Sequence, residues 1–162
     1  MNEKEAVAPA FIRVQQPLPL LPLGTLRQAL AYPQTAAAAG SQQAMEAALR
    51  DVGLGRLASR LDQTDDWSRI LSLGEQQRLA FARVLLVRPQ WVFLDEATSA
   101  LDEPREQEMY DLLRTRLPGL SIVSVGHRST LFAQHDEELH LTGDGSWDVR
   151  AIAAGTAPAA GC

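Results

Sequence analysis

Cysteine and lysine are almost absent from this 162-residue sequence, which has one of each: Cys162 at its end and Lys4 near its start. A single thiol excludes a disulfide framework and a thiolate metal site, and it fits a reducing compartment. No run approaches the roughly 20 apolar residues of a membrane-spanning helix, and no signal-peptide pattern begins the chain. Basic runs are also missing, and the net charge of −5 argues against nucleic-acid binding.

A phosphate-binding loop of the form G-x-x-x-x-G-K-[ST] is absent as well. The first glycine is Gly24, and the only lysine lies before it. In such a loop, backbone amides surround the phosphates of a nucleotide and the lysine neutralises their charge. We therefore expect this chain by itself to bind a nucleotide poorly.

The residues that are present predict one globular domain with 46% hydrophobic and 22% charged residues. Short helices are expected over 25–31 and 41–50, because a hydroxyl residue that can cap the helix stands at the start of each. The expected parts are a disordered or foreign start over 1–16, a helical subdomain over 17–70, a core over 71–150 and a flexible tail over 151–162. An extended, proline-rich loop is expected over 17–22.

The core is predicted to be α/β, because helix and strand patterns alternate after Ile70. Helices are expected from near Gly74 to before Pro89 and from Asp102, which would cap the second. The apolar run 91–94 predicts a strand covered on both faces of a mostly parallel sheet. A second strand is expected over 121–125, and a hairpin over 138–149.

Polar residues follow both predicted strands, at the edge where parallel sheets bind ligands. Asp95 and Glu96 follow the first strand, and His127 follows the second. Adjacent carboxylates suit magnesium–nucleotide chemistry, in which Asp95 would hold the metal through water and Glu96 would orient or deprotonate the attacking water. The alternative is a solvated acidic turn, and the two residues alone do not separate these interpretations.

Ser72, Gly74 and Glu75 stand at the start of the first core helix. The pattern S-x-x-E is a capping box, in which the serine and glutamate side chains satisfy free backbone amides. The same helix start attracts anions, because free amides and the helix dipole favour negative charge there. Cap and phosphate site are compatible, so both interpretations stay open.

Taken together, LSLGEQQRLAFARVLLVRPQWVFLDEATSALD over 71–102 and SVGHR over 124–128 resemble the distal half of an ATP-binding-cassette (ABC) nucleotide-binding domain. LSLGE corresponds to the family's LSGGQ signature, from which Leu73 and Glu75 depart. WVFLDE corresponds to the Walker B strand, SALD to the D-loop, and SVGHR contains the switch histidine. With LPLGTLRQALAYP upstream, the likeness is greatest to the peroxisomal fatty-acyl transporter subfamily and its bacterial permease-ATPase relatives.

The resemblance implies a partial P-loop NTPase fold whose N-terminal strands and phosphate loop are missing. It also implies that two such domains dimerise head to tail around ATP. Ser72, Gly74 and Glu75 would then touch the γ-phosphate held by the partner domain. Ser99 and Asp102, in the D-loop, would communicate across the dimer interface.

On its own side, the resemblance places His127 at the γ-phosphate and makes Glu96 and His127 the catalytic pair. Gln16 is the candidate for the Q-loop glutamine, with ATP and Mg²⁺ as cofactors. The implied partners are a second nucleotide-binding domain and a membrane permease domain, with no nucleic acid. The implied location is the cytoplasm, at the inner face of the plasma membrane.

Three interpretations of the function follow. The first is an ATP-hydrolysing transporter subunit whose permease and phosphate loop are lost or encoded elsewhere, so that this chain alone is inactive. The second is a non-catalytic module that lends its signature to a partner ATPase. The third is a fragment of a DNA-repair ATPase, which is disfavoured because residues 25–70 lack the heptad repeats of a coiled coil.

Overall fold

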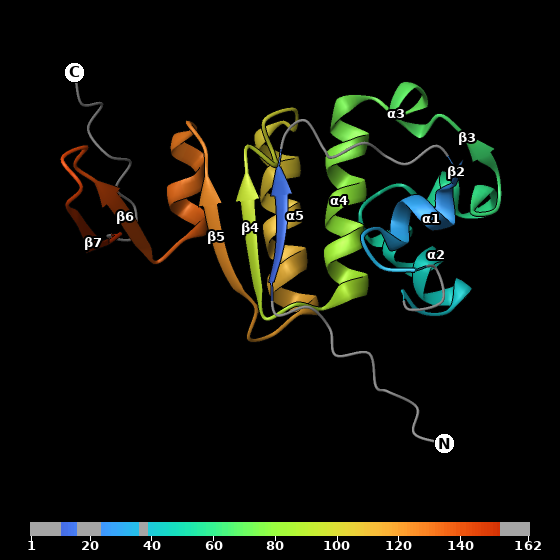
Figure 1. The fold of residues 1–162 in the computed structure, drawn as a ribbon, viewed down its shortest axis with the longest axis horizontal. Coiled ribbons are helices and arrows are strands. Elements are labelled where there is room, and N and C mark those ends of the chain that lie inside the picture. The colour runs from blue at the N-terminus through green and yellow to red at the C-terminus, as the bar shows by residue number, and fades with distance from the viewer. Residues whose placement is uncertain (1–10, 16–23, 36–38, 153–162) are drawn as a thin grey trace. The chain divides into compact units, whose positions relative to one another are not determined.

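The computed structural model describes residues 11–15, 24–35 and 39–152, which belong to two compact units that divide after Val125. The first unit contains a three-stranded parallel sheet in the order β1-β4-β5. Its strands are β1 (Phe11–Gln15), β4 (Trp91–Asp95) and β5 (Ser121–Val125). Figure 1 shows α5 (Glu103–Arg116) behind this sheet, with α4 (Leu73–Val87) beside α5. The α/β fold with parallel strands and flanking helices is confirmed.

Strand β1 corrects the expectation of a disordered or foreign start over 1–16. Residues 11–15 pair in parallel register with β4, from Phe11 opposite Trp91 to Gln15 opposite Asp95. The stretch forms an edge strand whose backbone bonds β4 along one side, and Val14 is buried. No local pattern in the sequence predicts this strand, because its partner lies about eighty residues away in the chain.

The apolar run 91–94 is buried on one face only, which corrects the expectation of a strand covered on both faces. Val92 and Leu94 are buried, whereas Trp91 is 47% and Phe93 41% exposed. Successive side chains of a strand point to opposite faces of the sheet. One face of β4 therefore packs into the core of this unit, and the other is open within the described part of the chain.

The described residues between Gly24 and Ile70 form short helices that pack against α4. They are α1 (Leu26–Ala31), α2 (Gln42–Asp51), the 3₁₀ helix η1 (Gly55–Arg60) and α3 (Trp67–Ile70). The short strands β2 (Gly24–Thr25) and β3 (Thr64–Asp65) pair antiparallel. The hydroxyls expected to cap the first two helices do so, since Thr25 and Ser41 accept bonds from the amides of Gln28 and Ala44. Both predicted helices are confirmed.

Helix α4 joins the short helices to the sheet. Its buried apolar residues include Leu79, Phe81 and Val84. Arg83 is also buried, and its Nε donates a 2.7 Å hydrogen bond to the carbonyl of Ala29 in α1. Desolvation lowers the pKa of Arg83 to about 10, so the guanidinium stays charged at neutral pH. Its hydrogen bond to Ala29 thus links α4 to the C-terminal half of α1.

Helix α5 begins at the expected cap, where the Asp102 carboxylate accepts a 3.0 Å hydrogen bond from the amide of Arg105. Met109 and Leu113 lie one turn apart and are buried. The Tyr110 hydroxyl bonds the Ser124 hydroxyl of β5 at 2.7 Å, and burial raises the pKa of Tyr110 to about 12. These contacts fix α5 against the sheet.

Gln77 holds the loop that follows β4. Its side chain is fully buried in α4, and its Nε2 donates to the Ser99 hydroxyl at 3.1 Å. Its Oε1 accepts a 3.0 Å hydrogen bond from the amide of Ala100. A longer contact of 3.4 Å reaches the carbonyl of Glu96. One buried amide therefore sets the path of residues 96–100.

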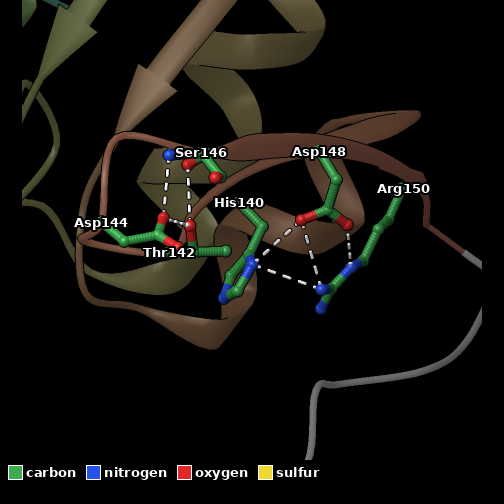
Figure 2. Close-up of polar contacts among 6 residues, drawn as sticks. All are labelled: His140, Thr142, Asp144, Ser146, Asp148 and Arg150. Carbon is green, nitrogen blue, oxygen red and sulfur yellow. Dashed lines mark hydrogen bonds and ion pairs between the residues drawn. The ribbon is translucent and has the colours of Figure 1, made fainter.

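The second unit contains the 3₁₀ helix η2 (Ser129–Gln134) and the antiparallel hairpin β6 (Glu137–Leu141) and β7 (Trp147–Ala151). In the hairpin turn, the Asp144 carboxylate accepts hydrogen bonds from the amide of Ser146 and from the hydroxyl of Thr142 (Figure 2). The bond from the Ser146 amide is 2.8 Å long. Farther along, Asp148 contacts both His140 and Arg150. The predicted hairpin is confirmed, and it has one polar face.

The opposite face of this hairpin is apolar and exposed. It consists of two cross-strand pairs, Leu139 with Val149 and Leu141 with Trp147. In the ranges that the structure describes, no helix combines the length and apolarity needed to cross a bilayer. The expected proline-rich loop over 17–22 and the greater part of the expected tail, 153–162, lie outside the described residues.

Replacing Gln77 by alanine tests its hold on the loop. The change removes the hydrogen bonds of Gln77 to Ser99 and Ala100 and leaves a cavity where its buried side chain lay, which costs about 1–3 kcal/mol of unfolding free energy. Urea unfolding followed by circular dichroism measures this loss. Gln107→Ala on the exposed side of α5 is the matched control, and it should change stability by no more than about 0.5 kcal/mol. Equal losses in both variants would contradict the role given to Gln77.

Candidate functional site

The start of α4 and the loop before α5 form an open hollow of about 180 Å³. Eight residues from these two segments line it: Ser72, Gly74, Glu75, Arg78, Ala100, Leu101, Asp102 and Arg105. Residues predicted for the signature and for the D-loop therefore lie around one hollow. It brings together the backbone of a helix start, hydroxyl and carboxylate groups, and two guanidinium groups.

Gly74 allows the two segments to approach each other closely. A Cβ atom at this position would lie 3.2 Å from the carbonyl oxygen of Ala100 and 3.5 Å from the side chain of Leu101. The first of these distances is tighter than an ordinary van der Waals contact, so a side chain here would make the loop move by a few tenths of an ångström. Glycine therefore favours this close packing, whether or not a ligand binds.

Ser72 and Glu75 form the complete capping box that the sequence predicts. The Ser72 hydroxyl accepts a 3.3 Å bond from the Glu75 amide, and the Glu75 carboxylate accepts a 2.9 Å bond from the Ser72 amide. The second carboxylate oxygen forms an ion pair with Arg56 of η1. The contact with Arg56 is the largest influence on the pKa of Glu75 and lowers it below its usual range. Burial of the carboxylate acts in the opposite direction and raises this pKa.

Two arginines line the hollow, and each forms hydrogen bonds with groups outside it. The Nη1 atom of Arg78 donates to the carbonyls of Val52 and Gly53, at 3.1 and 2.9 Å. Burial lowers the pKa of Arg78, but an arginine keeps its charge at neutral pH. Arg105 is paired with Glu108 on α5 at 2.6 Å. Both charges still contribute a positive potential that favours an anion in the hollow.

Asp95 and Glu96 lie at the C-terminal end of β4, as predicted, and neither lines the hollow. The Asp95 carboxylate is 29% exposed and pairs with Arg13 of β1 at 2.8 Å. Elsewhere in the described ranges too, no group of three or more potential metal ligands comes together. A magnesium ion commonly takes only one or two protein carboxylates and completes its shell with phosphates and water. Asp95, whose carboxylate already pairs with the guanidinium of Arg13, could be one such magnesium ligand.

The backbone of Glu96 adopts the left-handed conformation, with φ of 52°. This conformation is uncommon for a residue other than glycine, and it persists where the surroundings fix it. The Glu96 amide donates to the carbonyl of Val125 at 2.9 Å, and its own carbonyl accepts from the amide of Ser99 at 3.2 Å. The end of β5 and the following turn thus fix the orientation of Glu96.

The remaining predicted site residues lie in different parts of the chain. Ser99 bonds Gln77 and does not line the hollow, whereas Asp102 both caps α5 and lines it. His127 is exposed in the second unit, two residues after the end of β5, and its convergence with Glu96 stays a prediction. Gln16 lies outside the described residues.

Sequence reasoning missed three side chains that organise these places: Arg13, Arg56 and Gln77. Each contacts a residue that the sequence did identify: Arg13 pairs with Asp95, Arg56 pairs with Glu75, and Gln77 bonds Ser99. Gln77 is fully buried, but it stands in a polar stretch between Gln76 and Arg78, so its burial had no signal in the sequence. The two arginines carried no signal either, because surface arginines are common and their partners are distant in sequence.

Comparisons with known proteins agree with this arrangement. Residues 3–99 match the family described as "ABC transporter". An uncharacterized ABC transporter ATP-binding protein of Haemophilus influenzae is 53% identical over 131 residues, which is 81% of this chain and 22% of that protein. ATP-binding cassette sub-family D member 3 of Rattus norvegicus is 36% identical, over 83% of this chain and 21% of that protein.

A solved structure of a bacterial Atm1-family ABC exporter with ATP bound is similar as well. It has a TM-score of 0.66 and 31% sequence identity, and the match covers 80% of this chain and 23% of that one. This chain therefore spans about a fifth of the length of the curated relatives it matches. The family match covers more than half of the chain and includes helix α4 and strand β4. The chain belongs to the ABC transporter family, as part of an ATP-binding domain.

Proposed function

We propose that this chain acts as the signature-bearing part of an ABC transporter ATPase, which couples ATP hydrolysis to transport through a membrane permease. The observation that carries the proposal is the hollow shared by Ser72–Glu75 and Ala100–Asp102. Its helix-start amides suit the terminal phosphate of an ATP molecule held by a second nucleotide-binding domain. The likeness to an ATP-bound exporter supports the same assignment.

The proposed chemistry divides between two places. At the hollow, Ser72 and Gly74 would present a hydroxyl and backbone amides to the γ-phosphate on the partner domain. At the end of β4, Glu96 would orient and deprotonate the attacking water, and His127 would stabilise the phosphate charge. The fixed backbone of Glu96 supports this role, because a general base needs a defined position relative to the water.

ATP and Mg²⁺ are the proposed cofactors. Bound Mg²⁺ neutralises charge on the transferring phosphate. Asp95 would hold this ion, by way of water. The Arg13 guanidinium lies 2.8 Å from one oxygen of the Asp95 carboxylate. When Mg²⁺ binds, Arg13 would therefore move away from this oxygen or share the carboxylate with the hydrated ion. The proposed location is the cytoplasmic side of the membrane, where a permease domain would hold the ATPase.

A second candidate is a module that lends its signature to a partner without hydrolysing ATP itself. The absence of a G-x-x-x-x-G-K-[ST] motif from the 162 residues favours it for this chain taken alone. The hollow serves both candidates equally, because in both it faces a nucleotide that the partner holds. The two candidates differ in the role of Glu96. In the first, Glu96 is required for ATP hydrolysis, and in the second it has no catalytic role.

ATP-dependent association tests the hollow. The partner is a family nucleotide-binding domain that carries a phosphate loop, with its own signature serine replaced so that it does not pair with itself. We expect this chain to bind that partner in the presence of ATP and Mg²⁺ and not with ADP, as measured by analytical ultracentrifugation. Ser72→Ala should weaken binding about tenfold, the value of one charge-assisted hydrogen bond.

Ser41→Ala is the matched control, because Ser41 caps α2 through the same kind of bond, at 3.2 Å. Either substitution should cost about 1 kcal/mol of stability through the lost cap. Only Ser72→Ala should reduce association. Association that is independent of ATP, or equally sensitive to both changes, would count against a phosphate site at the hollow.

The role of Glu96 can be tested in a chimera in which this chain's sequence replaces the matching 131 residues of the H. influenzae relative. Glu96→Gln should reduce steady-state ATP turnover by about 10²–10⁴-fold, since the amide does not accept a proton, yet leave ATP binding intact. Phosphate release and nucleotide affinity are measured on the same preparation. Glu103→Gln, in the exposed first turn of α5, is the control. Unimpaired hydrolysis would remove Glu96 from its role.

Calorimetry on the chain alone tests the consequence of the missing motif. Without the amides and the lysine of a phosphate loop, we expect no heat of binding for ATP with Mg²⁺ at concentrations up to about 1 mM. A dissociation constant of that size corresponds to a binding free energy of about −4 kcal/mol. Colorimetric phosphate release should also stay at the background rate. Saturable binding below that concentration would show that phosphate contacts exist elsewhere in the chain.

A further inference from the structure

We infer that Arg56 is a positioning residue for the phosphate site at the start of α4: it neutralises Glu75, so that an anion can approach the helix-start amides. The inference rests on the proposed function of the hollow and deepens it. Arg56 does not line the hollow and belongs to η1, in the helical part of the first unit. It would therefore act on the nucleotide only through Glu75.

The contacts show that both carboxylate oxygens of Glu75 are in use. Oε1 pairs with the Nη2 atom of Arg56, and Oε2 accepts from the amide and the hydroxyl of Ser72, at 2.9 and 3.1 Å. The Glu75 side chain is 19% exposed, against 54% for Arg56. The carboxylate is thus held in one place, facing the residue whose hydroxyl would meet the phosphate.

The charge of Glu75 poses a problem at this place. A free helix start attracts anions through its amides and its dipole, and a carboxylate in the first turn competes for the same potential. An approaching phosphate would meet a like charge, which is unfavourable at the short distances across a hollow of this size. A counter-charge beside Glu75 would reduce this repulsion.

Arg56 is the side chain placed to supply that counter-charge. The two arginines that line the hollow do not pair with Glu75 in this way. Arg78 donates to the backbone carbonyls of residues 52 and 53, and Arg105 pairs with Glu108. Arg56 is also the largest cause of the low pKa of Glu75, which keeps the carboxylate ionised and its cap intact. The pair therefore preserves the capping box and cancels its charge.

A set of four variants tests the inference: Arg56→Met, Arg56→Lys, Glu75→Gln and the double variant Arg56→Met with Glu75→Gln. Glutamine also completes a capping box, so Glu75→Gln removes the charge and keeps the helix start. Arg69→Met is the control, because Arg69 forms an exposed ion pair with Asp66 in the same helical part. Circular dichroism establishes that each variant is folded.

The first measurement is an NMR titration of the Glu75 side-chain carboxyl in the chain alone. Arg56→Met should raise the Glu75 pKa, Arg56→Lys should raise it less, and Arg69→Met should not change it. The second measurement is ATP-dependent association with the partner domain described above. Arg56→Met should weaken it about five- to tenfold, as expected for one uncompensated charge in a partly buried position. The double variant should bind within about twofold of Glu75→Gln.

The outcomes separate this inference from the proposed function. Rescue of Arg56→Met by Glu75→Gln supports the inference, because lost packing by Arg56 would persist in the double variant. An unchanged Glu75 pKa in Arg56→Met overturns it, as does normal association by that variant, while the function of the hollow stands. Failure of the unsubstituted chain to associate with ATP overturns the proposed function, and the inference with it.

Discussion

The close contact between the first turns of α4 and the loop over residues 96–102 is the constraint on which the site depends. Gly74 lets the loop approach to a distance at which a Cβ atom would make a tight contact, and Gln77 bonds the loop from within the core. Without this contact the hollow would have one wall, since half of its lining comes from residues 100–105. The same contact also reaches the carbonyl of Glu96.

Much of the fold could be predicted because its signals are local. Capping hydroxyls, helical spacing and short apolar runs involve residues within a few positions of one another. The starts of α1, α2 and α5, and the extent of β5, therefore agree with the sequence-based expectations. The positions of Asp95 and Glu96 at a strand end follow from the same kind of signal.

What could not be predicted depends on partners that are distant in sequence. Strand β1 and its ion pair from Arg13 to Asp95 bridge 82 positions, and no local pattern records such pairing. The open face of β4 escaped prediction for another reason. An unbroken apolar run has the same appearance whether one or both faces are covered, so the exposure of Trp91 and Phe93 had no signal.

The two ion pairs place a positive charge beside each of two carboxylates in an acidic chain. Glu75 and Asp95 stand at the two proposed places of phosphate chemistry, and each is paired with an arginine from a different element. Both arginines are more than half exposed, so salt screens their charges more than those of buried groups. The net charge of −5 therefore does not decide the potential at either place; the local pairs do.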